Sequence, residues 1–118
     1  MSETNVEIAR RGYDAAARGE FEALREILAP DVKWHGGDPS SGCQNREQTL
    51  EFMRRARAMG ELVEVIDARE KVVVILRRQA EHTDTTELVA NLTTFRDGKV
   101  IEMVHYPNPD DARVAAGV

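Results

Sequence analysis

The sequence predicts an α+β fold in which helices from the first half of the chain pack on one face of a curved antiparallel sheet from the second half. Apolar residues recur at helical spacing through most of the first 60 residues, and from Leu62 onward apolar and polar residues alternate. Helices that precede the strands, instead of alternating with them, are typical of this class. The 118 residues fit a single domain, 1–118, which can bury a core without disulfides.

Two helices are predicted before residue 30. Thr4 and Glu7 form a capping box for a helix that extends to about Arg18, and Gly19 ends it. A second, short helix must end before Pro30, because proline cannot continue a helix. The apolar residues of this second helix are Phe21, Leu24 and Leu28.

A brief strand, a loop and a third helix follow. The strand is 31–35, and the side chains predicted to face inward are Val32 and Trp34. Residues 36–42 contain three glycines and a proline, so we expect a mobile loop that acts as the gate of a pocket. Asn45 and Gln48 form a second capping box, and Gly60 ends the helix. Its apolar flank consists of Thr49, Phe52, Met53, Ala56 and Met59.

The remaining chain is predicted to form four strands and a short helix. The strands are Leu62–Arg69, Lys71–Ala80, Thr86–Arg96 and Lys99–Tyr106. The last two are joined through Asp97-Gly98, the strongest short-range signal for a hairpin. Asn108 then caps the helix, and Pro109 occupies its first position, where the missing N–H costs nothing.

The register of the last hairpin decides on which face of the sheet Asn91 lies. A two-residue Asp97-Gly98 turn pairs Ala90 with His105 and leaves Asn91 on the opposite face. A three-residue loop, 96–98, with a bulge shifts the pairing by one residue and brings Asn91 onto the face of His105.

Composition argues against several classes of function. The net charge of −5 argues against a nucleic-acid binder, and the basic runs on the predicted helices are interpreted as solvated. The single cysteine, Cys43, excludes an internal disulfide, and the three histidines lack metal-ligand spacing, so no metal is predicted. No segment resembles a signal peptide or a membrane span, so we expect a cytoplasmic protein without a membrane partner.

Three segments carry a family pattern: Tyr13–Leu24, Leu28–His35 and Phe95–Glu102. In order and spacing they resemble the nuclear-transport-factor-2-like superfamily, and within it the SnoaL-like polyketide cyclases and the relatives of ketosteroid isomerase. The resemblance covers nearly the whole chain. It implies a cone-shaped, cystatin-like roll with three N-terminal helices on the concave face of the sheet and a hydrophobic pocket between them. It does not imply one reaction, because the fold hosts isomerases, cyclases, hydrolases, dehydratases and inert binders.

The family's functional positions transfer one by one. The acid/base aspartate of the polyketide cyclases falls on His105, and its histidine partner falls on Asn91. The isomerase base falls near Gly36, its oxyanion-hole carboxylic acid at or beside Asn91, and its tyrosine close to Tyr13. Both catalytic sets are therefore altered, so the resemblance implies the fold and not those reactions. The family spacing favours the register that places Asn91 beside His105.

His105 is the principal catalytic candidate. With Ile101 and Met103 it forms an apolar row, while Glu102 lies on the other face of the strand. An imidazole in such a row titrates near neutrality and can move a proton at pH 7, and burial is expected to lower its pKa. The structural alternative is a ring that only satisfies a neighbouring carbonyl.

Asn91 is the second catalytic candidate, because beside His105 its amide can donate to a developing oxyanion. In the other register it faces water or a partner subunit. The candidate substrate-binding residues are Tyr13, Trp34, Met53, Thr93 and Met103. Tyr13 either directs its hydroxyl into the cavity or packs between helices. His35 is expected at the surface or the pocket mouth, and His82 in a solvated loop.

Two functions fit these residues. The first is an isomerase-, cyclase- or lyase-type enzyme that uses acid/base chemistry, without metal or organic cofactor, on a small apolar carbonyl compound or polyketide-like ring. The second is a non-catalytic ligand-binding or assembly module on the same fold. A pocket with one titratable residue leaves both open. Asp38 in the loop is the only acidic candidate near the pocket mouth.

A homodimer is also expected. The strand Lys71–Ala80 is apolar on both faces, with Val72 and Val74 on one side and Val73 and Ile75 on the other. The N-terminal helices cover only the concave side, so the second side is predicted to contact another subunit.

Overall fold

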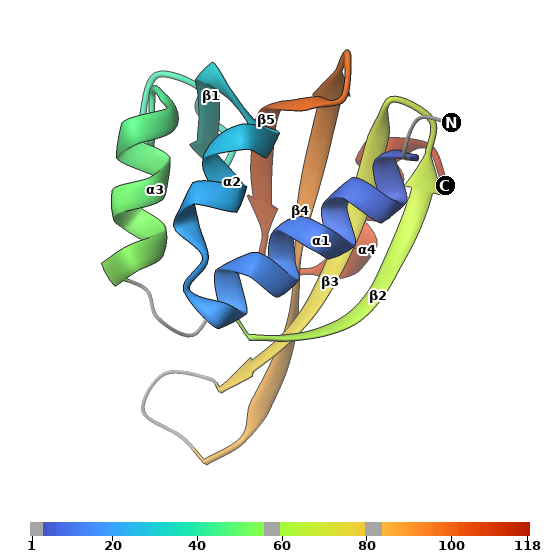
Figure 1. Cartoon of the computed structure of the whole chain (residues 1–118). Coiled ribbons are helices and arrows are strands. Elements are labelled where there is room, and N and C mark those ends of the chain that lie inside the picture. The colour runs from blue at the N-terminus through green and yellow to red at the C-terminus, as the bar shows by residue number, and fades with distance from the viewer. Residues whose placement is uncertain (1–3, 56–59, 80–83) are drawn as a thin grey trace.

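The computed structural model describes residues 4–55, 60–79 and 84–118 (Figure 1). Its elements in chain order are α1 (Asn5–Arg18), α2 (Phe21–Ile27), β1 (Leu28–His35), α3 (Arg46–Arg55), β2 (Glu61–Ala68), β3 (Lys71–Gln79), β4 (Thr86–Arg96), β5 (Lys99–Tyr106) and α4 (Pro109–Ala116). The predicted α+β class is confirmed. Four predicted positions, Ala56, Met59, Ala80 and His82, lie outside the described residues.

The five strands form one sheet in the order β1-β5-β4-β3-β2. The pairs from β2 to β5 are antiparallel, as predicted. β1, however, pairs with β5 in parallel, so the sheet is mostly rather than wholly antiparallel. This pairing joins strands that are distant in sequence, and neither strand carries a local pattern that sets its direction.

Three helices lie on the concave face of the sheet. α1 begins at the predicted capping box, in which Thr4 and Glu7 bond each other's backbone N–H groups. It crosses the sheet and contacts α2, β2 and β3, while α3 packs against β1 (Figure 1). The main core lies between these layers, and its fully buried members include Val32, Leu50, Val72 and Val74.

α4 lies on the opposite face of the sheet and covers part of it, over β3, β4 and β5 (Figure 1). Ala112 of this helix is fully buried against a second apolar cluster that contains Val73, Ile75, Ala90 and Leu92. The premise that only another subunit can cover this face is therefore wrong. The homodimer itself stays a prediction, and its support must come from the part of the face that α4 leaves exposed.

The second helix ends earlier than predicted, and the first strand begins earlier. α2 stops at Ile27, and β1 runs from Leu28 through Pro30 to His35. A proline is tolerated because β1 is an edge strand, and because the pairing with β5 is irregular between Leu28 and Lys33. No helix among the described residues has the length and apolar character needed to cross a membrane.

The last hairpin reaches the expected register by a different route. Its turn has two residues, since Arg96 pairs with Lys99, and both Asp97 (φ 52°) and Gly98 (φ 76°) adopt left-handed conformations. The shift comes later, where the pairing jumps past Ile101 and then aligns Asn91 with His105. Two-residue turns with two positive φ angles match the twist of a hairpin, and an extra residue in one strand makes a β-bulge.

Because of this bulge, the apolar row on β5 differs from the predicted one. Val100 and Met103 both belong to the concave core, although strict alternation would place residues three apart on opposite faces. The extra residue, Ile101, resets the alternation, so the row below His105 consists of Val100 and Met103.

Candidate functional site

A cavity of about 450 Å³ opens between α3, the loop after β1 and the concave face of the sheet. We call it the outer cavity, and its lining residues are Trp34, His35, Gly36, Gly42, Cys43, Phe52, Leu76, Arg78, Val89, Asn91 and His105. Cavities of this size hold small organic ligands, and their walls are usually apolar with a few polar groups. Here the polar groups come mainly from β3, β4 and β5.

An aromatic pair forms one wall of the outer cavity. The rings of Trp34 and Phe52 meet edge to face with their centroids 5.0 Å apart. Phe52 is 49% exposed, which is unusual for a large apolar residue and places it at the opening. Gly42 (φ 76°) lies beside this wall, where a Cβ would come within 2.3 Å of the Trp34 carbonyl oxygen. The loop after β1 can therefore pass this close to the strand only with glycine at that position.

Three polar side chains form a hydrogen-bonded chain across the concave face. Nδ2 of Asn91 donates to the Tyr13 hydroxyl at 2.8 Å. Oδ1 of the same amide lies 3.3 Å from Nδ1 of His105. Asn91 is only 2% exposed, so both ends of its buried amide have partners.

These hydrogen bonds determine which nitrogen of the neutral His105 imidazole carries the proton. Oδ1 of Asn91 is a carbonyl oxygen and can only accept, so Nδ1 of His105 must donate. In the neutral ring, Nε2 then carries the lone pair. The geometry therefore selects the tautomer in which Nε2 of His105 can accept a proton.

Burial shifts the pKa values at the two ends of the chain in opposite directions. Desolvation lowers the pKa of His105 below its ordinary 6.5, because burial disfavours the charged ring, and the positive charge of Arg78 adds to this effect. Desolvation raises the pKa of Tyr13 to about 12, against the smaller opposing effects of Asn91 and the nearby Thr93 hydroxyl. At pH 7 the site therefore holds a neutral imidazole and a protonated phenol.

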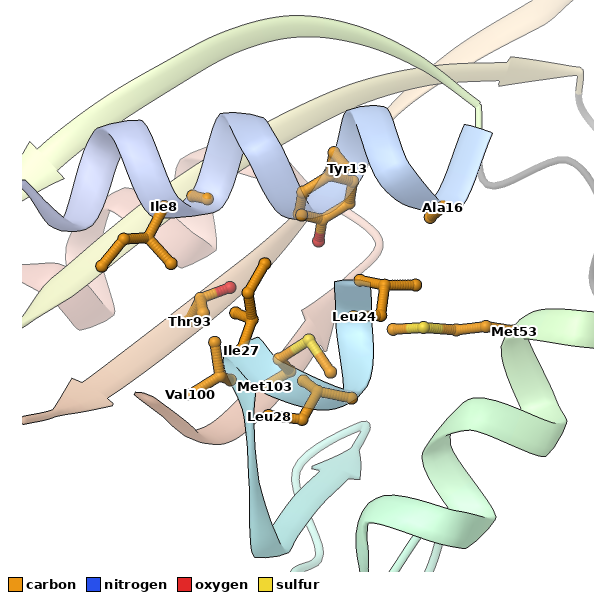
Figure 2. A pocket seen from close by; sticks show the side chains of 12 residues that line it. Ile8, Tyr13, Ala16, Leu24, Ile27, Leu28, Met53, Thr93, Val100 and Met103 are labelled. Atoms are coloured by element: carbon orange, nitrogen blue, oxygen red, sulfur yellow. The ribbon is translucent and has the colours of Figure 1, made fainter. Parts of the chain in front are cut away.

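A second, smaller space of about 30 Å³ lies deeper, between α1, α2 and the sheet. We call it the inner cavity; Figure 2 shows that Tyr13 directs its hydroxyl toward it from α1. Its volume is about that of one water molecule. The Thr93 hydroxyl also borders it, is buried, and finds no partner at hydrogen-bond geometry among the described residues.

The predicted site residues therefore divide between two cavities. His105, Asn91 and Trp34 line the outer cavity. Tyr13, Met53, Thr93 and Met103 line the inner one. The hydrogen bond between Asn91 and Tyr13 is the polar link between the two groups. The catalytic and substrate-binding roles of these residues stay predictions.

His35, which was expected at the surface or the pocket mouth, lines the outer cavity and is not at the surface. Its side chain is buried, and its Nε2 lies 2.9 Å from a carboxylate oxygen of Glu102. The Gly37 N–H donates to its Nδ1 at 3.0 Å, so Nε2 carries the proton in the neutral ring. His35 thus fixes the start of the loop, a role that the local sequence does not indicate because Glu102 is 67 residues away.

The loop 36–42 is braced at its end. Trp34 and Cys43 exchange backbone hydrogen bonds at 3.0 and 2.8 Å, and the Gln44 side chain donates to two carbonyls of the loop. Asp38 accepts from the backbone and hydroxyl of Ser40, which lowers its pKa, and it does not line the outer cavity. The predicted acidic partner for His105 is therefore absent from the lining. The gating role of the loop stays a prediction.

Sequence reasoning missed Arg78 as a cavity residue. It lines the outer cavity, and its Nε donates to Glu87 at 2.9 Å across the β3–β4 pair. Strand alternation carried the signal, because Arg78 is two residues beyond Leu76 and shares its face. Among the described residues, no group of three His, Cys, Asp or Glu side chains could hold a metal ion.

Comparisons with known proteins agree on the fold. The profile of the SnoaL-like domain matches residues 9–103. A candidate polyketide cyclase from Sinorhizobium meliloti is 20% identical, with a TM-score of 0.69 over 84% of this chain and 93% of that one. An NTF2-like protein from Burkholderia pseudomallei is 20% identical, with a TM-score of 0.71 over 99% and 100%. One from Cytophaga hutchinsonii is 14% identical, with a TM-score of 0.75 over 93% and 96%. No curated protein matches the chain.

Proposed function

Because the chain belongs to the SnoaL-like domain family, we propose that it is a cofactor-free enzyme that acts by acid/base chemistry on a small apolar carbonyl compound in the outer cavity. The observation that supports this most directly is the chain from His105 through Asn91 to Tyr13. It holds a neutral imidazole in one tautomer at the wall of an apolar cavity. The polyketide cyclase assignment of one structural relative is consistent with this class of substrate.

In the proposed reaction His105 is the catalytic base. Its Nε2 takes a proton from the carbon next to the ligand carbonyl, which leaves an enolate, and then returns the proton to carbon or to oxygen. Asn91 is a positioning residue in this proposal, because its Nδ2 is bonded to Tyr13 and its Oδ1 holds the Nδ1–H of the imidazole. It would therefore orient the base rather than donate to the oxyanion.

Proton exchange tests this proposal without knowledge of the natural substrate. With 2-tetralone as probe, the protein is expected to accelerate exchange of the protons next to the carbonyl with D2O, measured by proton NMR. His105→Gln keeps a hydrogen-bonding group but removes the titration, so we expect the acceleration to fall on the order of 100-fold. His82→Gln, at a position that the sequence predicts to be a solvated loop, is the control and should retain it.

The alternative is a non-catalytic binding module, and one observation favours it. His105 has no carboxylate partner among the described residues that line the outer cavity. The same experiment separates the two functions. Binding of 2-tetralone without accelerated exchange, or equal exchange by wild type and His105→Gln, would contradict the enzyme and support the module.

A further inference from the structure

Among the described residues that line the outer cavity, Arg78 is the only permanently charged side chain and none carries a carboxylate. We propose that the ligand carries a carboxylate beside its apolar ring system, and that Arg78 binds this carboxylate at the rim of the cavity. The inference rests on the proposed function, because it names the substrate class of the same cavity.

The position of Arg78 predicts how the ligand is oriented in the outer cavity. Leu76 and Arg78 lie on the same face of β3, and Leu76 is buried whereas the Arg78 side chain is 44% exposed. The cation is therefore at the rim, and the apolar Leu76 on the same strand face lies deeper in the cavity. A ligand with an apolar body and one anionic end matches this gradient, because its rings leave water while its charge stays at the edge.

The positive charge of Arg78 at the rim is opposite in sign to the net charge of the molecule. The chain carries a net charge of −5, whereas the described lining of the cavity contains one permanent cation and no carboxylate, so this part of the wall is locally positive. Glu87 accepts from Nε of Arg78 and offsets part of this charge. At His105 the positive charge of Arg78, which lowers the pKa of the imidazole, has a larger effect than the negative charge of Glu87, which raises it.

The chemistry of the guanidinium favours a carboxylate over other anions. The group is planar with five N–H donors, and a carboxylate can accept two of them side by side. A phosphate ester carries close to two negative charges, which one arginine beside Glu87 would not balance.

Matched probes test the proposal by calorimetric titration. 2-Naphthoate and 2-naphthamide share one ring system and differ in charge, and 2-naphthyl phosphate supplies the alternative anion. Because hydrogen bonds to a charged group are stronger, we expect the affinity for 2-naphthoate to exceed that for 2-naphthamide by roughly tenfold or more. Equal affinities, tighter binding of 2-naphthyl phosphate, or no binding of 2-naphthoate at millimolar concentration would overturn the proposal.

Single substitutions test whether Arg78 causes the preference for 2-naphthoate. Arg78→Met should remove it, and Glu87→Gln should strengthen 2-naphthoate binding by freeing the guanidinium. Arg77→Met is the matched control, since the Arg77 side chain is 47% exposed and pairs with Glu61 but does not line the cavity. Retention of the preference in Arg78→Met, or its loss in Arg77→Met, would contradict the assignment.

A further variant separates failure of this inference from failure of the proposed function. Trp34→Leu removes part of the aromatic wall and should weaken both naphthyl probes. If Trp34→Leu weakens binding of both probes while Arg78→Met leaves the carboxylate preference intact, only the assignment of Arg78 as the carboxylate-binding residue is wrong. If Trp34→Leu changes neither affinity, the ligand lies outside the outer cavity, and the proposed function and the inference both fail.

Discussion

At the scale of single residues, the site depends on Asn91, because its one amide contacts both other polar groups. An aspartate here would offer only acceptors, so it would lose the donor to the Tyr13 hydroxyl and favour a charged His105. A histidine would be larger than the buried amide. Asparagine adds no charge beside the imidazole, which burial holds neutral, and it fixes the tautomer; a base at pH 7 requires both properties.

The lowered pKa of His105 predicts how stability depends on pH. The unfolded chain protonates this residue near its ordinary pKa of 6.5, whereas the folded chain protonates it only at lower pH. Between these two values the unfolded state binds more protons, so stability falls as pH drops below about 6.5 and the loss is complete below the folded pKa. Urea unfolding from pH 8 to pH 5, on the order of three units around this window, should show a shallower decline for His105→Gln than for wild type.

The other two histidines are unchanged in both proteins, so their contributions cancel in this comparison. His82→Gln is the second control and should decline in parallel with wild type. Parallel declines for wild type and His105→Gln would show that His105 titrates alike in the folded and unfolded chains, and would contradict the lowered pKa of the imidazole in the folded protein.

At the scale of elements, the fourth helix determines which surfaces of the sheet stay exposed. Ala112→Asp places a carboxylate in the fully buried contact with Val73 and Ile75, so we expect a loss of at least about 3 kcal/mol of stability. Detachment of α4 should also expose the apolar face and cause self-association, measured by light scattering. Ala115→Asp, at an exposed position of the same helix, should stay within about 0.5 kcal/mol of wild type. Equal effects of the two substitutions would contradict the covering role of α4.

Elements with local signals were predictable from the sequence. The capping box at Thr4 and Glu7 fixed the start of α1, and Asp97-Gly98 fixed the turn between β4 and β5. The bulge at Ile101 has no such signal, because an extra apolar residue in a strand looks like the rest of the strand. The pairing of Asn91 with His105 was therefore expected correctly, but through a loop that the structure does not contain.

Contacts between distant segments were not predictable. The parallel pairing of β1 with β5 and the bond between His35 and Glu102 depend on how the whole chain closes. The sequence placed Tyr13 and Asn91 on separate elements, and only the fold brings them to 2.8 Å. Arg78 is the exception, since strand alternation alone indicated its face.

At the scale of the whole molecule, the inner and outer cavities between the two layers differ in capacity. The inner one has room for about one water molecule, so it cannot hold an organic ligand without rearrangement. The outer one can, and it has its polar chain at one wall and its cation at the rim. The fold thus separates a packed core from a ligand space along the concave face of the same sheet.

The last prediction concerns the homodimer, and it rests on the surface that α4 leaves exposed. β4 pairs with β3 as far as Thr86, but its pairing with β5 ends at Ala90, so the end of the β3–β4 hairpin projects from the sheet (Figure 1). Leu88 in this projection is 45% exposed. The β5 side of this end of β4 has no pairing strand among the described residues, and an open strand edge with an exposed apolar residue favours contact with a second copy. We therefore expect a dimer in sedimentation velocity at concentrations on the order of tens of micromolar.

Substitution distinguishes this contact from a general tendency to associate. Leu88→Glu places a charge in the proposed interface and should shift the protein to monomer, with little change in unfolding free energy because the residue is half exposed. Val114→Glu, at an exposed valine of α4, is the matched control and should leave the dimer intact. A wild-type monomer at these concentrations would rule out the homodimer. A dimer that survives Leu88→Glu and dissociates in Val114→Glu would move the interface from the hairpin to α4.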